Sequence, residues 1–179
     1  MRIGICGTHA TGKTTVLNYL RSIKRFENYT FCVECTREVM RLGLSINENG
    51  TDTTQKLIMQ SHVFNLYMYE DMITDRTAYD GLAYSRYLFS KQSITAECMD
   101  HVQKVFNKTY QDYDIIFHIK PEFDVIDDGV RSMNSDFRVQ VDIEFDSILS
   151  EFPPNRLCML TGSVENRAAQ IINFLENLK

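Results

Sequence analysis

The sequence predicts an α/β fold in which a doubly wound, five-stranded parallel sheet is flanked by helices and carries a mobile lid. Two observations support this prediction. Short, mostly apolar segments alternate with longer segments of helical periodicity along the whole chain. A glycine-rich loop follows the first apolar segment directly and leads into an amphipathic helical pattern. Such alternation is typical of parallel strands joined by right-handed helical crossovers.

Each element follows from its own pattern. Strands are expected where short apolar runs occur, because strands covered on both faces have this composition: residues 2–6, 29–33, 71–74, 114–119 and 156–160. Helical periodicity predicts helices over residues 13–24, 37–42, 54–69, 79–89, 94–110, 136–149 and 164–178. In such a sheet, ligands bind beyond the carboxyl ends of the strands, so the residues that follow each strand are the candidates for function.

Length and composition limit the organisation. A chain of 179 residues suits one domain, and none of its turn-rich stretches resembles an interdomain linker, so residues 1–179 are expected as a single domain. The net charge of −5 makes a nucleic-acid partner unfavourable. No segment has the apolar length of a membrane span, so no membrane partner is expected. Five cysteines, an odd number, do not suggest a disulfide framework and favour a cytoplasmic location. Oligomeric state stays open, a homodimer included.

The most specific motif is the loop after the first strand. Residues 7–14 read Gly-Thr-His-Ala-Thr-Gly-Lys-Thr, which matches the phosphate-binding pattern G-x-x-x-x-G-K-[ST] between a strand and a helix. Its glycines let the backbone curl so that amides point at phosphate oxygens. Lys13, expected in a solvent-facing loop, can reach the β- and γ-phosphates, and the Thr14 hydroxyl can bind Mg²⁺. The expected ATP-binding residues here are Gly7, Thr8, His9, Ala10, Thr11, Gly12, Lys13, Thr14 and Thr15, with His9 contributing its backbone.

Charged residues follow the second predicted strand. Glu34 can orient an acceptor hydroxyl or take its proton. Arg37 can pair with a phosphate or a carboxylate. The alternative is that the two residues cap the next helix or pair with each other.

The third predicted strand leads into Asp75 and Arg76. Asp75 can hold Mg²⁺ directly or through water, completing a metal site with Thr14. Arg76 would face the phosphates being transferred; the alternative is an exposed salt bridge. Asp80 and Tyr84 lie four residues apart on one face of the next helix and can line an acceptor pocket, although Tyr84 suits core packing equally well.

A lid is expected over residues 120–138. Arg131 and Arg138 are seven residues apart, so they point the same way if the segment between them is helical. With Gly129 as a hinge, their guanidinium groups would close over the triphosphate and neutralise developing charge. The alternative is a surface loop with solvated arginines.

The fifth predicted strand exits through Gly162 and Ser163. This small-residue turn leaves room for an adenine ring, on which Arg167 can stack, while Ser163 also suits the N-cap of the last helix. His62, His101 and His118 have no acidic or cysteine partners at metal-binding spacing and are expected to be structural.

The whole chain resembles the small P-loop kinases of nucleosides and nucleotides, in particular the AAA-type subgroup that includes ribosylnicotinamide kinase domains. Thymidylate kinases are more distantly similar. The resemblance rests on the following motifs: residues 7–14, Glu34-x-x-Arg37-Glu38, Asp75-Arg76 with Asp80 and Ala83-Tyr84, Asp128-Gly-x-Arg131 with Phe137-Arg138, and Gly162-Ser163-x-x-x-Arg167. It implies ATP with Mg²⁺ as the donor, Asp75 near the metal, and Arg131 and Arg138 in the lid. It leaves the acceptor open. The chain lacks the proline after Glu34 that deoxynucleoside and thymidylate kinases would carry, which weakens a deoxynucleoside assignment.

Three functions compete at this point. The first is a kinase that transfers the γ-phosphoryl group of Mg-ATP to a small nucleoside or nucleoside monophosphate. The second is a regulatory NTP-binding switch or ATPase. The third is a kinase that acts on a polynucleotide hydroxyl, which the acidic charge balance disfavours. The first is the prediction, with Lys13, Glu34, Asp75, Arg76, Arg131 and Arg138 as its catalytic residues.

Overall fold

The computed structural model describes residues 1–123 and 132–178 and confirms the predicted fold class. Five parallel strands form one sheet in the order β2-β3-β1-β4-β5. The strands are β1 (Arg2–Cys6), β2 (Thr30–Cys32), β3 (Met72–Asp75), β4 (Ile115–Ile119) and β5 (Leu157–Leu160). The longer helices are α1 (Lys13–Arg21), α2 (Thr36–Arg41), α3 (Asp52–Met68), α4 (Ala78–Ser90), α5 (Ala96–Thr109), α6 (Ser135–Leu149) and α7 (Val164–Glu176).

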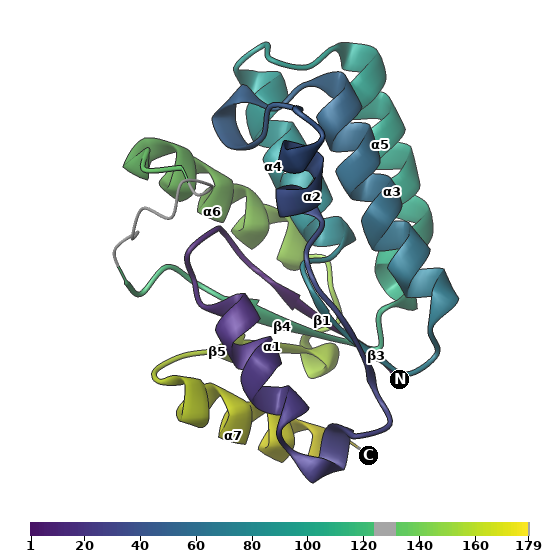
Figure 1. Cartoon of the computed structure of the whole chain (residues 1–179), viewed down its shortest axis with the longest axis vertical. Coiled ribbons are helices and arrows are strands. Elements are labelled where there is room, and N and C mark those ends of the chain that lie inside the picture. Colours follow the sequence, from purple (N-terminus) through teal and green to yellow (C-terminus); the bar gives the residue numbers. More distant parts are fainter. Residues whose placement is uncertain (124–131, 179) are drawn as a thin grey trace.

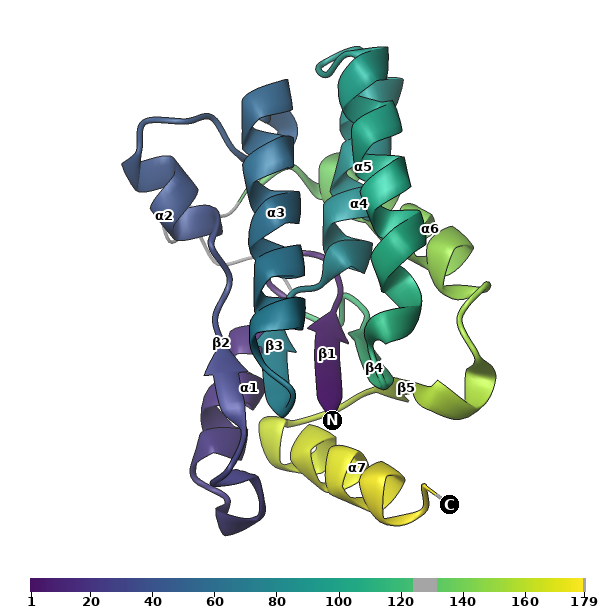
Figure 2. The same ribbon diagram turned by 90° about the vertical axis from the view of Figure 1, so that its right-hand side faces the viewer.

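Helices cover both faces of the sheet (Figure 1). On one face α3, α4, α5 and α6 bury a core that includes Met59, Leu82 and Phe145. On the other face α1 and α7 pack together over a second core that includes Leu17 and Ile171. Figure 2 shows α3, α4 and α5 side by side on the first face and α7 on the opposite side of the strands. Burial on both faces explains why the central strands β1, β3 and β4 read as continuous apolar runs.

The register of the central strands brings their carboxyl ends together. Ile5 of β1 pairs with Asp75 of β3, and Cys6 pairs with His118 of β4. The loop that leaves β1 therefore begins between the end of β3 and the end of β4. This is the edge at which an open α/β sheet binds its ligands.

Side-chain caps explain several helix starts. Thr51 caps α3, Thr77 and Asp80 form a reciprocal capping box at α4, and Ser163 caps α7 as expected. Asn134 caps α6, which therefore begins only at Ser135. Within residues 1–123 and 132–178, no helix combines the length and apolar character that crossing a membrane would need.

Candidate active site

The glycine-rich loop is the connection between β1 and α1. Gly7 has φ +140°, and a Cβ atom there would lie 2.3 Å from the carbonyl oxygen of Ile119, so only glycine permits this approach to β4. Gly12 has φ +86° and stands immediately before α1. Both positions use a backbone conformation that side chains disfavour. The loop is thus shaped as a phosphate-binding loop requires.

Two buried arginines orient the amides of this loop. Arg138 of α6 donates to the carbonyl of Ala10 at 3.2 Å, and Arg167 of α7 donates to the carbonyl of Thr11 at 2.6 Å. In a planar trans peptide, the N–H of the next residue points opposite to the carbonyl. With these two carbonyls held on the protein side, the amides of Thr11 and Gly12 face the cavity above the loop, where they can donate to an anion.

Lys13 does not project into solvent as expected. Its side chain is only 5% exposed, and Nζ donates to the carbonyls of Gly7 and Thr8 at 2.8 and 2.6 Å and to the Thr11 hydroxyl at 3.2 Å. Burial, followed by the repulsion of Arg76, lowers the pKa of Lys13. A buried ammonium needs such acceptors, and the loop supplies them where a phosphate would otherwise do so. The expectation of a solvent-facing lysine is wrong for this conformation.

The predicted metal pair is adjacent. The Thr14 hydroxyl donates to Oδ2 of Asp75, which is 1% exposed, while Asp75 Oδ1 has no hydrogen-bond partner among the described residues. Burial raises the pKa of Asp75. The hydroxyl of an exposed threonine beside a buried carboxylate with an unsatisfied oxygen fits Mg²⁺, which takes one or two protein oxygens and completes its shell with water and phosphate. The described residues include no cluster of three or more His, Cys, Asp or Glu side chains suited to a metal.

The expectation that His9 contributes only its backbone is wrong, because its side chain also makes contacts within the fold. Its ring stacks on Phe137 at 5.4 Å between centroids, Nε2 lies 3.1 Å from the Ser132 carbonyl, and the backbone N–H donates to the Tyr84 hydroxyl at 2.8 Å. Burial, helped by nearby cations, lowers the pKa of His9 to about 3, so the ring is neutral. The imidazole therefore joins the loop to α4 and α6.

Glu34 and Arg76 form an ion pair between the ends of β2 and β3. Burial alone would raise the pKa of Glu34, but the Arg76 guanidinium outweighs this and lowers it to about 2. Arg76 adopts φ +74°, and the Thr74 hydroxyl donates to its carbonyl at 2.9 Å, which helps to hold this uncommon conformation. Glu34 thus pairs with Arg76. The alternative that Glu34 caps the next helix is wrong, because α2 has no side-chain cap. The alternative of an exposed Arg76 salt bridge is also wrong, because Arg76 is only 8% exposed.

Asp80 connects the loop to α4. Its Oδ1 accepts from the Gly7 amide at 3.3 Å, and Oδ2 accepts from the amide and hydroxyl of Thr77 at 2.8 and 3.0 Å. Burial raises the pKa of Asp80 to about 6 despite these bonds. One turn later, the ring of Tyr84 lies beneath the Arg76 guanidinium, 5.1 Å from ring centroid to Cζ.

Two cavities meet at these residues. The first, about 490 Å³ including space open to solvent, is lined by the loop, Thr14, Glu34, Arg37 and Asp75. The second, about 350 Å³ on the same basis, lies between α3 and α4. Its wall consists of Thr36, Asn47, Gln55, Ile58, His62, Arg76, Asp80, Gly81 and Tyr84. Thr36, Asn47 and Arg76 line both cavities, so the two spaces adjoin.

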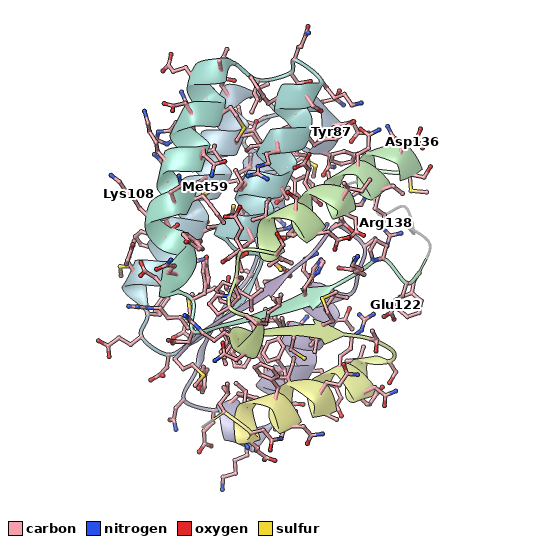
Figure 3. The ribbon with its side chains drawn as sticks, turned by 180° about the vertical axis from the view of Figure 1, so that it is seen from behind. Met59, Tyr87, Lys108, Glu122, Asp136 and Arg138 are labelled. Carbon is pink, nitrogen blue, oxygen red and sulfur yellow. The ribbon has the colours of Figure 1, made fainter. Side chains whose placement is uncertain are left out.

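The predicted lid is only partly described. Gly129 and Arg131 lie outside the described residues. Residues 132–134 are not helical, so the condition under which Arg131 and Arg138 were expected to point the same way is not met. Arg138 is 8% exposed and donates to the carbonyls of Phe123 and Ala10. Figure 3 shows Arg138 on α6 and Glu122 after β4 on the same side of the molecule, at the carboxyl end of the sheet.

Arg167 also differs from expectation. Besides its bond to Thr11, it donates to Glu122 at 3.0 Å, and its guanidinium lies over the ring of Phe123. Arg167 is only 2% exposed and supports the glycine-rich loop. The expectation that its guanidinium stacks on adenine is therefore wrong for this conformation. Gly162 adopts φ +84°, and its amide donates to Glu122 at 3.0 Å. Thr15, one residue beyond Thr14, lines the first cavity as expected.

Several residues that line the second cavity were not expected there: Asn47 and Gln55 were not singled out, and His62 was expected to be structural. Gln55 and His62 on α3, and Asn47 before it, line the second cavity although they do not follow a strand. For Gln55 and His62 the only signal was polar character within a helical pattern, which is also typical of an exposed helix face, and Asn47 lies between two predicted helices. Glu122 follows β4 and could have been found by the strand-end rule.

Comparisons with known proteins agree with this architecture. A family model described as an AAA domain matches residues 2–167. A search of curated proteins found no match. A crystal structure of NadR protein in complex with NR superposes with a TM-score of 0.71 at 22% identity, covering 97% of this chain and 50% of NadR. This chain therefore spans half of the NadR chain. Deoxyadenosine kinase from M. mycoides with products dCMP and dCDP bound gives a TM-score of 0.72 at 15% identity, covering 99% and 100%. These structural likenesses show the fold, and the match of the family model over nearly the whole length shows that the chain belongs to the AAA domain family.

Proposed function

We propose that this protein is a phosphotransferase that moves the γ-phosphoryl group of Mg-ATP to a hydroxyl of a small nucleoside. The observation that carries the proposal is the pair of adjoining cavities. One contains the glycine-rich loop with its lysine and the Thr14–Asp75 pair, and the other is a mostly neutral cavity that adjoins it. The NadR and deoxyadenosine kinase structures, whose complexes contain NR and deoxynucleotides, support the same assignment.

The donor side follows from the loop. The amides of Thr11 and Gly12 and the Lys13 ammonium would hold the phosphates of ATP. Thr14 and Asp75 would hold Mg²⁺, which when bound neutralises charge on the phosphates. Phosphoryl transfer depends mainly on such positioning and charge neutralisation. For this, Lys13 has to exchange its loop carbonyls for phosphate oxygens.

The acceptor side follows from Glu34 and Arg76. Arg76 holds Glu34 ionised, with its pKa lowered to about 2, so this carboxylate is a weak base that orients an acceptor hydroxyl rather than removing its proton. Little proton abstraction is needed in a loose transition state. The burial-raised pKa of Asp75 makes it the stronger base, but its Oδ2 is already engaged by Thr14.

The charges favour a nucleoside over a nucleoside monophosphate as the acceptor. Arg76 is the cationic side chain of the second cavity, and it is paired with Glu34 and lies 3.8 Å from Asp80. A second phosphate placed there would face the Asp80 carboxylate and a guanidinium that is already paired. Arg37 lines the first cavity, where it can contact the transferred phosphate.

The test is an acceptor panel with Mg-ATP. Purified protein is incubated with nucleosides including ribosylnicotinamide, nucleoside monophosphates and 5′-hydroxyl oligonucleotides, while ADP is measured and phosphorylated product is identified by mass. We expect product from a nucleoside, loss of product on chelating Mg²⁺, and no product with Lys13→Ala, whose folding is checked by thermal unfolding. Product from monophosphates alone would overturn the nucleoside assignment. ADP formed without an acceptor would favour a regulatory NTPase switch. Phosphorylated oligonucleotide would favour a polynucleotide kinase.

A further inference from the structure

The glycine-rich loop does not hold its shape by backbone preference alone. Ala10 adopts φ +57°, a left-handed conformation that residues with a side chain disfavour. Such a conformation persists where the surrounding contacts impose it. Arg138 and Arg167 supply these contacts for the second half of the loop, through the carbonyls of Ala10 and Thr11. The first half of the loop, residues 7–9, needs contacts from elsewhere.

The peptide between Thr8 and His9 is held from two opposite sides. Its carbonyl accepts from Nζ of Lys13 at 2.6 Å and from the hydroxyl of Thr11 at 3.0 Å. Its N–H points the opposite way, as in any trans peptide, and donates to the hydroxyl of Tyr84 at 2.8 Å. When Lys13 turns to a bound phosphate, as the proposed function requires, the carbonyl loses its charged partner. The Tyr84 hydroxyl then holds this peptide from outside the loop.

The imidazole of His9 determines how the Tyr84 hydroxyl is oriented. Nε2 lies 3.1 Å from the carbonyl oxygen of Ser132, which can only accept, so Nε2 carries the ring proton. Burial lowers the pKa of His9 to about 3, so the ring is neutral and Nδ1 is an acceptor. Nδ1 lies 3.3 Å from the Tyr84 hydroxyl, which therefore donates its proton to the ring. The oxygen of this hydroxyl is left to accept from the loop N–H.

The imidazole is itself fixed by α6 and by the segment before it. Its ring stacks on Phe137 with an interplanar angle of 20°. The Ser132 hydroxyl donates to Glu48 at 2.7 Å and accepts from the amide of Asn134 at 3.1 Å, which keeps the neighbouring Ser132 carbonyl in place. The chain of hydrogen bonds from Ser132 through the His9 ring therefore has a rigid origin and ends on the loop peptide.

We propose that His9 and Tyr84 are positioning residues that keep the Thr8–His9 peptide, and with it the glycine-rich loop, in the phosphate-binding conformation while Lys13 contacts the phosphates. This inference rests on the donor half of the proposed function, the binding of ATP at this loop. The imidazole acts through the Tyr84 hydroxyl, and the hydroxyl acts through the loop peptide. In this role neither side chain has to touch the ligand. Loss of either side chain should weaken the binding of the phosphates and leave the contacts to adenosine unchanged.

The experiment measures the Kd of Mg-ATP and of inorganic tripolyphosphate by titration calorimetry, with no acceptor present. Tripolyphosphate offers the phosphate contacts without the nucleoside. Tyr84→Phe removes only the hydroxyl, and His9→Phe keeps an aromatic ring but removes both ring nitrogens. We expect each change to raise the Kd about 5- to 100-fold, by the same factor for both ligands, because a buried hydrogen-bonding partner is left unsatisfied.

A rescue variant and a double variant test whether the two side chains act as one chain. His9→Asn returns an amide oxygen near the position of Nδ1, which can accept from the Tyr84 hydroxyl, so it should recover part of the affinity. It also keeps the test available if His9→Phe does not fold. The double variant His9→Phe/Tyr84→Phe should bind about as weakly as the weaker single variant, because both changes break the same chain.

Tyr79→Phe is the matched control. Tyr79 is also a buried tyrosine of α4, but its hydroxyl donates to the carbonyl of Tyr110 at 3.2 Å, and it lines neither cavity. This change should lower the Tm and leave both Kd values as in the wild type. The control therefore separates a loss of helix stability from a loss of loop position.

Several results would overturn the positioning role. These are unchanged Kd values in Tyr84→Phe, an equal loss in Tyr79→Phe, or a loss for Mg-ATP that tripolyphosphate does not show, since the last would place the contact on the nucleoside. The failure of the proposed function looks different. Wild-type protein that binds Mg-ATP but phosphorylates no acceptor would overturn the kinase assignment alone. Wild-type protein that binds neither phosphate ligand would overturn both.

Discussion

The Nε–H of Arg76 donates to the carboxylate of Glu34, so an ion pair joins the ends of β2 and β3 inside the site. The two side chains are 9% and 20% exposed, which places the pair away from most solvent. Removing one partner of such a pair leaves the other charge without compensation, and this costs more than the intact pair contributes.

The pair should therefore behave as a unit. We expect Glu34→Gln and Arg76→Gln each to lower the free energy of unfolding by about 2–4 kcal/mol, and the double variant to lose less than the sum by about 1–3 kcal/mol. Urea unfolding of the four proteins measures this coupling. Strict additivity would mean that the two side chains act independently. The surface pair Arg41–Glu38, with side chains 70% and 66% exposed, is the control and should show coupling below about 1 kcal/mol.

Substitution of Asp75 should affect stability and activity in different ways. Because burial raises its pKa, ionised Asp75 is costly to the fold, and Asp75→Asn should leave the Tm unchanged or higher. The same change removes the charge that would attract Mg²⁺, so the Mg²⁺ concentration for half-maximal activity should rise about 10- to 100-fold. Titrating activity with Mg²⁺ at fixed ATP tests this. A variant with normal Mg²⁺ dependence would exclude Asp75 from the metal site.

Stability should fall as the solution is acidified, and His118 allows one contribution to be isolated. Its ring is 1% exposed in β4, and burial lowers its pKa to about 4. Between pH 6.5 and 4 the unfolded chain binds a proton at this residue and the folded chain does not, so the contribution is complete above pH 6.5 and is lost toward pH 4. His118→Leu should reduce the slope of the unfolding free energy by about 1.4 kcal/mol per pH unit in this window. The unfolding free energy of the variant and the wild type is measured by urea unfolding at several pH values. Equal slopes against pH would show that His118 binds its proton in the folded chain over the same pH range as in the unfolded chain.

The two predicted lid arginines should now give different results. Arg138 holds the carbonyls of Ala10 and Phe123, so Arg138→Ala should lower the Tm as well as weaken ATP binding. Arg131 lies outside the described residues, and its role over the triphosphate remains a prediction. For Arg131→Ala we expect kcat to fall about 10²–10⁴-fold. Steady-state kinetics with thermal unfolding distinguishes the two, and an unchanged kcat in Arg131→Ala would remove this residue from the chemistry.

The elements of the fold could be predicted because their signals are local. Among the described residues, the apolar and helical patterns located the five strands and the seven α-helices, and the errors fell at their ends, where Asp75 belongs to β3 and α6 starts at Ser135; the short 3₁₀ helices were not predicted. The candidate residues at the strand ends, such as Glu34 and Arg76, were found because parallel topology gathers them at one edge.

Other features depend on tertiary contacts that no local pattern encodes. The stacking of His9 on Phe137 joins residues 128 positions apart, and the bond from Arg167 to Thr11 joins residues 156 positions apart. His62 looks the same in sequence whether its helix face meets solvent or a cavity. Its place in the wall of the second cavity depends on the packing of α3 against α4.

The two cores on opposite faces of the sheet have a consequence for how this protein can change. The glycine-rich loop continues into α1, which packs with α7 on one face of the sheet. Part of the wall of the second cavity is built by α3, on the opposite face of the sheet. Substitutions at Gln55 or His62 therefore alter a surface whose packing partners are not those of α1. Under the proposed kinase function, acceptor preference is therefore separable from the phosphate loop, and redesign of α3 alone should change which nucleosides are accepted while phosphoryl transfer is retained.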